Sequence, residues 1–106
     1  MNREITIEIE KLIGMFIIAK GTPIGVGFTY FPKLPKPLTE NLNFAYGCNA
    51  NFVCLRVNSN FEVECWFKDG DDNTFSYGLK KVKKLQPFLY VAIFTHVFDI
   101  IENIDM

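Results

Sequence analysis

The chain has 106 residues, of which 49% are hydrophobic and 15% aromatic, and its formal net charge is −1 at pH 7. This composition excludes a disordered chain and predicts one globular domain over residues 1–106, and the near-neutral charge argues against nucleic acid or an anionic membrane as a partner. No apolar run reaches the roughly 18 to 20 residues that span a bilayer. The three cysteines form no C-x-x-C pair, so we expect free thiols in a cytoplasmic protein.

Two periodicities compete in the first segment. Residues 4–10, "EITIEIE", alternate between apolar and polar residues as a half-buried strand does. Over the longer window 5–20, apolar residues recur at spacings of three and four, which is the pattern of a helix face. Gly21 follows where a helix end often takes a left-handed residue. We expect a helix over 5–20, and a strand over 3–10 stays open as the alternative.

A strand, a proline-rich connector and a short helix are predicted next. Residues 24–31, "IGVGFTYF", alternate and predict a strand. Residues 32–37, "PKLPKP", form an extended connector, because proline lacks the N–H that a sheet ladder needs. Thr39 is a favourable helix start and Gly47 a favourable end, so we expect a short helix over 40–46.

The clearest hairpin signal lies in the middle of the chain. Strands over 52–57 and 61–68 flank a short polar loop, "NSN". Pairing Val57 with Phe61 sets apolar residues opposite apolar residues, whereas a slip of one residue sets them opposite glutamates. This register needs a left-handed loop residue, for which we expect Asn60.

A further strand over 74–81 is predicted to pair with the second strand of that hairpin. The favoured register sets Phe67 opposite Phe75 and leaves residues 69–73, "DGDDN", as the turn. The turn begins like a calcium-binding loop, but Thr74 and Lys80 stand where that loop needs a glycine and a carboxylate. We therefore interpret it as a hairpin tip without a metal ion.

The outward face of these three strands carries an unusual mixture of side chains. Arg56 and Lys80 are predicted to lie on either side of Glu62, as a ladder of alternating charge. Phe52 is predicted to lie beside Trp66 on the same face. Either this aromatic pair is exposed to a partner, or the 40–46 helix folds over it.

A helix over 87–104 closes the predicted fold, and it begins at a proline, which suits a first helical position. Its apolar arc is wider than one sheet contact requires, so it should also contact the first helix or pair with a second subunit in a homodimer. The fold class is α+β, with an antiparallel sheet of about four strands and helices at both ends. The predicted core is Val26, Phe28, Val53, Leu55, Val63, Phe67, Phe75, Leu79, Ile93, Val97 and Ile100.

No motif in the sequence names an enzyme, and we expect no catalytic residue, cofactor or metal. His96 is the one histidine, and Asp99 follows it at helical spacing. A small enzyme that uses His96 with Cys48 is one alternative, because a nucleophile needs an adjacent base. A surface histidine–aspartate pair on the helix explains the spacing more simply.

We interpret the chain as a non-enzymatic binding protein. The most concrete form of this hypothesis is a small bacterial inhibitor or immunity-type protein that blocks a toxin or nuclease. Tryptophan and arginine are enriched at binding hot spots, and clustered carboxylates favour a partner with a basic surface. A dimeric secretion chaperone or adaptor, paired through the last helix, is the alternative. The predicted partner-binding residues are Phe52, Arg56, Glu62, Glu64, Trp66, Asp69, Asp71 and Asp72.

Overall fold

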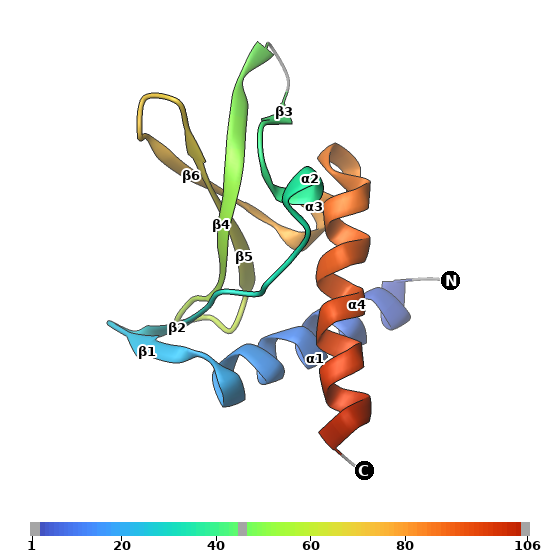
Figure 1. Ribbon diagram of the computed structural model, residues 1–106. Coiled ribbons are helices and arrows are strands. Elements are labelled where there is room, and N and C mark those ends of the chain that lie inside the picture. Colours follow the sequence, from blue (N-terminus) through green and yellow to red (C-terminus); the bar gives the residue numbers. More distant parts are fainter. Residues whose placement is uncertain (1–2, 45–46, 105–106) are drawn as a thin grey trace.

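The computed structural model describes residues 3–44 and 47–104 and has an α+β fold (Figure 1). The sheet is antiparallel with the strand order β1-β2-β4-β5-β6, and β3 pairs with β4 beside β2. The elements in chain order are α1 (Arg3–Lys20), β1 (Thr22–Ile24), β2 (Gly27–Tyr30), α2 (Lys36–Thr39), β3 (Leu42–Asn43), β4 (Asn49–Val57), β5 (Val63–Asp69), β6 (Thr74–Gly78), α3 (Leu79–Leu85) and α4 (Pro87–Ile104).

All of the helices lie toward one face of the sheet formed by β4, β5 and β6 (Figure 1). Helix α1 contacts β2, β4 and β5, and α3 contacts β5 and β6, while α4 packs on α1, α2 and α3. In the described part of the chain, no helix lies against the opposite face of these three strands (Figure 1). We call the helix-covered face the inner face and the opposite one the outer face.

The first segment is a helix, so the alternative of a strand over 3–10 is wrong. Ile13 and Ile17 are fully buried, and the burial of this helical face overrides the local alternation. The helix ends where the Gly21 N–H donates to the Ile17 carbonyl at 2.7 Å. A Cβ at Gly21 would lie 2.5 Å from that carbonyl oxygen and 2.6 Å from the carbonyl oxygen of Thr29. Glycine is therefore required here by close backbone approach, and not by a left-handed conformation.

The predicted continuous strand over 24–31 is wrong, because a tight turn divides it into β1 and β2. Ile24 pairs with Gly27, which leaves Gly25 and Val26 as a two-residue hairpin loop. Gly25 has φ of 61°, as the first position of such a loop often requires. Val26 is 81% exposed in this loop, so its place in the predicted core is wrong.

The predicted helix over 40–46 is also wrong. A single helical turn, α2, forms earlier, where prolines can occupy the first positions of a helix. Asn41 then adopts φ of 52°, and the chain enters the short strand β3. Phe44 packs edge-to-face on Phe67 on the inner face, with ring centroids 4.9 Å apart. This segment therefore covers the inner face, and residues 45–46 lie outside the described residues.

The β4–β5 hairpin forms, but its register differs from the predicted one by two residues. Val57 pairs with Val63 rather than with Phe61. A shift of two residues leaves every side chain on its face, so the apolar pairing survives. The longer loop places Phe61, rather than Asn60, in the left-handed region, with φ of 63°. The Asn58 side chain organises this loop, because its Oδ1 accepts the Asn60 N–H at 2.9 Å.

A β-bulge between Phe52 and Cys54 changes the face on which Phe52 lies. Phe52 pairs with Phe67, and their ring centroids are 5.9 Å apart on the inner face. Cys54, not Phe52, is the cross-strand neighbour of Trp66. Val53 is 38% exposed at the bulge, so its predicted place in the core is wrong.

The β5–β6 hairpin has the predicted register, with Phe67 opposite Phe75. The 69–73 segment is a hairpin tip, as predicted, in which the Asp69 carboxylate accepts the Asn73 N–H at 2.9 Å. The last strand is shorter than predicted, because helix α3 begins directly after Gly78. Lys80 lies on α3, so the predicted charge ladder around Glu62 does not form.

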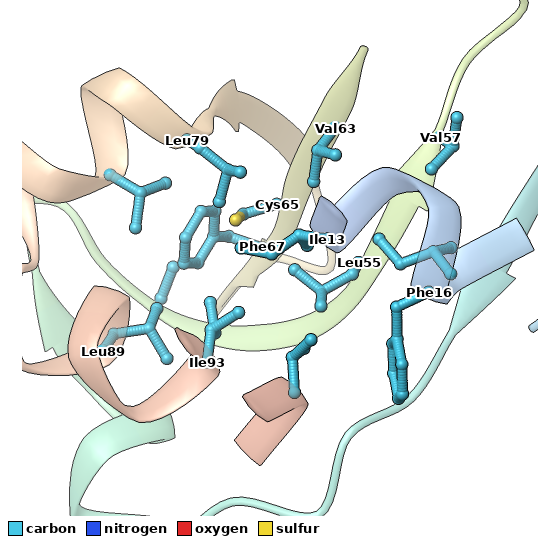
Figure 2. Packing of buried hydrophobic residues seen from close by; sticks show 14 of the residues in the cluster. Ile13, Phe16, Leu55, Val57, Val63, Cys65, Phe67, Leu79, Leu89 and Ile93 are labelled. Carbon is cyan, nitrogen blue, oxygen red and sulfur yellow. The ribbon is translucent and has the colours of Figure 1, made fainter. Parts of the chain in front are cut away.

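Helix α4 has the predicted bounds, and its inward stripe joins α1, α3 and the sheet in one hydrophobic cluster (Figure 2). Six predicted core residues are buried, namely Leu55, Val63, Phe67, Leu79, Ile93 and Val97. Phe28, Phe75 and Ile100 are half-buried and pack against the cluster. Among the described residues, no helix is both long enough and apolar enough to cross a membrane.

Candidate functional site

The outer face carries a shallow hollow of about 230 Å³, which we call the outer-face site. It draws on five strands, because adjacent antiparallel strands bring their outward side chains together. Its largest side chains that carry a hydrogen-bonding group are those of Trp66 on β5 and Arg56 on β4. The residues that line it are Ile24, Thr29, Val53, Cys54, Arg56, Trp66 and Thr74.

A chain of hydrogen bonds fixes the indole of Trp66. Its Nε1 donates to Glu64 Oε1 at 3.1 Å, and the two residues lie on one face because they are two positions apart in a strand. Asn58 Nδ2 donates to Glu64 Oε2 at 3.3 Å and to Glu62 Oε1 at 3.1 Å. The Trp66 ring is half-buried and is oriented before any partner binds. This reduces the side-chain entropy that is lost on binding.

Arg56 lies at the middle of the outer face. It is the cross-strand neighbour of Glu64 on one side and of Thr29 on the other. Its guanidinium Nη2 donates to the Ile24 carbonyl at 3.4 Å, which ties β4 to the β1–β2 hairpin. The side chain is half-buried, so its planar donor group is both positioned and accessible to a carboxylate or carbonyl.

The two cysteines of the central strands are unsuited to nucleophilic chemistry. Burial raises the pKa of the Cys54 thiol, although the charge of Arg56 offsets part of this effect. Burial, together with the neighbouring Cys54, raises the pKa of Cys65 to about 12. Because the thiolate is the reactive form, both groups stay protonated and unreactive near neutral pH.

The structure brings some of the predicted partner-binding residues together and separates others. Trp66, Arg56 and Glu64 share the outer face, and Glu62 reaches this group through Asn58. Phe52 lies on the inner face, where it packs on the core. The predicted aromatic pair therefore does not form.

The acidic hairpin tip lies beyond the end of β5, beside the outer-face site. Asp69 is half-buried and caps the turn by accepting the Asp71 N–H at 2.9 Å. Asp72 lies 3.6 Å from the Lys68 ammonium, so part of the negative charge is balanced within the tip. Asp71 and Asp72 are exposed and remain available to a cationic partner.

Sequence reasoning missed four residues of the outer-face site, namely Ile24, Thr29, Val53 and Thr74. Ile24 faces outward because of the β1–β2 turn, and Val53 lines the hollow because of the bulge in β4. Thr29 is 5% exposed and lies under the same hollow. The glycine pair that flanks Val26 was a signal for the turn, but nothing in the apolar run around Val53 marked the bulge.

A second hollow, the α2–α4 groove, has a volume of about 590 Å³. His96 lies in it, and His96 Nε2 forms a hydrogen bond with the Tyr30 hydroxyl at 2.7 Å. Cys48, with which His96 was paired in the enzyme alternative, is exposed and is not among the lining residues. The groove is lined by Lys33, Leu34, Pro35, Leu38, Phe88, Val91, Ala92, Thr95, His96 and Asp99.

The His96–Tyr30 contact predicts a pH-dependent contribution to stability. Burial lowers the pKa of His96 below its ordinary 6.5, and Asp99 opposes part of this shift. Because the unfolded chain binds this proton more readily, stability present above pH 6.5 falls as the pH decreases toward the lower folded pKa.

Chemical denaturation at several pH values tests this expectation. Between about pH 7.5 and about pH 5.5, the wild type should lose more free energy of unfolding than a His96→Gln variant does. Lys33 and Asp99 share the groove and remain in both proteins, so the difference isolates the imidazole. Equal losses in the two proteins would show that the pKa of His96 does not differ between the folded and the unfolded chain.

No protein-family model, curated protein or solved structure matches this chain. Among the described residues, no cluster of three or more histidine, cysteine, aspartate or glutamate side chains could hold a metal ion.

Proposed function

We propose that the protein is a non-enzymatic binding module that docks a partner protein on its outer-face site. The observation that carries this proposal is the half-buried Trp66, which is held by a 3.1 Å hydrogen bond on a sheet face that no helix in the described part of the chain covers. Tryptophan and arginine dominate the energetics of protein interfaces, particularly where their orientation is fixed in advance. Trp66 and Arg56 supply both groups within one hollow.

The partner should present a basic surface. Carboxylates outnumber cations along β5 and the loops at its two ends, where Glu62, Glu64, Asp69, Asp71 and Asp72 stand against Lys68, with Arg56 on the adjacent β4. Carboxylates placed around an aromatic anchor steer association with a cationic cleft and disfavour acidic competitors. This pattern favours a small bacterial inhibitor of the immunity type, which would block a basic toxin or nuclease in the cytoplasm.

The positions of the cysteines and of His96 favour this proposal over a small cysteine enzyme, because Cys48 does not line the groove that holds His96. Cys54 lies within the outer-face site, but burial raises the pKa of its thiol. His96 is hydrogen-bonded to Tyr30 at 2.7 Å and is thereby engaged in joining α4 to β2. A nucleophile needs an adjacent base and a low thiol pKa.

Differential capture followed by affinity measurement tests the proposal. A tagged wild-type chain and a Trp66→Ala variant are used as baits in native lysate, with Phe31→Ala as the matched control. Phe31 is an exposed aromatic residue outside the outer-face site. The expected result is one protein that the wild type and the control retain and that the Trp66 variant loses.

The affinities of the purified partner for the wild type and for the Trp66 variant then give the size of the effect. Replacing Trp66 by alanine should weaken binding by about 2 kcal/mol, which is roughly thirtyfold in Kd. Matching melting curves of the two baits would exclude misfolding as the cause. A Kd for the Trp66 variant within twofold of wild type would remove the tryptophan from the interface and overturn the proposed site.

A further inference from the structure

Helix α4 presents an apolar patch to solvent at its beginning. Phe88 is 77% exposed and Val91 is 59% exposed, although both belong to a helix whose opposite stripe is fully buried. They form one wall of the α2–α4 groove, and Leu34, Pro35 and Leu38 form the other. Large exposed apolar side chains beside an apolar groove are typical of an interaction surface.

The charges along this part of the chain are segregated. Helix α3, which precedes α4 directly, carries Lys80, Lys81, Lys83 and Lys84 and no acidic residue. Helix α4 contains no lysine or arginine, and its second half carries the exposed residues Asp99 and Glu102. The helix dipole adds to this polarity, because its positive end lies at the start of α4 and its negative end at the finish.

We propose that the α2–α4 groove docks a second copy of this chain, with the two α4 helices antiparallel. A two-fold axis places the same patch on both copies, so each Phe88 and Val91 enters the groove of the other. Asp99 and Glu102 in the second half of each α4 then lie toward Lys81 and Lys84 on α3 of the other copy. The charge pattern is self-complementary only in this antiparallel arrangement, and this selects a second copy as the occupant.

This homodimer goes beyond the proposed function and does not depend on it. The groove is lined by residues of α2, α4 and the segment before α2. Helices α2 and α4 lie on the side of the sheet opposite to the outer face, whose strands supply the lining of the outer-face site (Figure 1). Each dimer would therefore keep two outer-face sites free for partners. Two linked sites raise the avidity for a multivalent partner without any new contact.

Sedimentation equilibrium with one matched pair of variants tests the apolar contact. At about 50 µM, the wild type should sediment at twice the chain mass of 12.2 kDa. Phe88→Glu should sediment as a monomer, because a carboxylate would be buried in an apolar groove. Phe61→Glu is the control, since Phe61 is 76% exposed but lies in the β4–β5 loop, and this variant should stay dimeric.

A charge exchange tests the antiparallel arrangement itself. One variant carries Asp99→Lys with Glu102→Lys, and the other carries Lys81→Glu with Lys84→Glu. Lys81 and Lys84 are chosen because Lys83 lies over the Tyr90 ring and Lys80 lines a different hollow, near α1. Each variant alone brings like charges together and should dimerise about tenfold more weakly.

Mixing the two charge variants should restore dimerisation as a heterodimer, because every contact between the ends of the two helices is again of opposite sign. Three results would overturn the proposal: a monomeric wild type, a dimeric Phe88→Glu variant, or a mixture of charge variants that does not associate. Retained folding of each variant is confirmed from its far-ultraviolet circular dichroism.

Discussion

Replacing Phe67 by alanine is expected to lower the free energy of unfolding by about 3–5 kcal/mol. Phe67 is fully buried on the inner face at the centre of the hydrophobic cluster (Figure 2). Its ring is stacked on Phe75 at 5.5 Å and meets Phe44 edge-to-face at 4.9 Å. Removal of this ring leaves a cavity that the surrounding side chains fill only in part.

Urea denaturation of the Phe67→Ala variant and of a Phe31→Ala control gives the free energy of unfolding of each protein. Phe31 is the same residue type but is 63% exposed, so its replacement should change stability by no more than about 0.5 kcal/mol. A loss at Phe67 no larger than the loss at Phe31 would contradict the assignment of the inner face as the core.

Replacing Gly21 by alanine is the second large effect that we expect, a loss of about 3 kcal/mol. The added methyl group would lie 2.5 Å from the Ile17 carbonyl oxygen and 2.6 Å from that of Thr29. Both oxygens belong to the backbone, one to α1 and one to β2, so neither can rotate away. The helix must separate from the strand, and this would disturb the packing of Ile17 in the core.

Gly70→Ala is the matched control for this variant. A Cβ at Gly70 would meet nothing within 4 Å, and its φ is outside the left-handed region. Its stability should therefore change by about 0.5 kcal/mol or less. Thermal unfolding followed by circular dichroism compares the two, and an unchanged midpoint for Gly21→Ala would show that α1 and β2 are not held this closely.

The parts of the fold that the sequence predicts well are those with a strong local signal. Helix α4 begins at Pro87, which is favourable at a first helical position, and its apolar residues repeat at helical spacing. The β5–β6 hairpin was also predictable, because the turn sequence fixes its length and Asp69 accepts backbone N–H groups within it. In both cases neighbouring residues decide the structure.

The errors arise where two arrangements fit the same pattern of apolar and polar residues. A two-residue shift of the β4–β5 register keeps every side chain on its face, so alternation alone cannot detect it. The Asn58 side chain favours the longer loop by accepting the N–H groups of Asn60 and Glu62. The bulge at Val53 could not be predicted for a similar reason. In a continuous apolar run, the residues on both faces of the strand are apolar, so the pattern does not show where the faces change.

The candidate site was predictable in part. Glu64 and Trp66 were placed on one face by their spacing, and the structure joins them by a hydrogen bond. Phe52 was misplaced because the bulge lies between Phe52 and Cys54 and reverses the alternation of faces at Phe52. The hydrogen bond between Tyr30 and His96 links residues 66 positions apart, and no pattern in the chain could have indicated it.

Binding of a partner through Trp66 on the outer face can be tested by fluorescence quenching. The chain contains one tryptophan, so its emission reports on this site alone. Acrylamide should quench the half-buried indole of the free protein and should quench it much less once the captured partner saturates the chain. An unchanged quenching constant in the complex would show that the partner binds elsewhere.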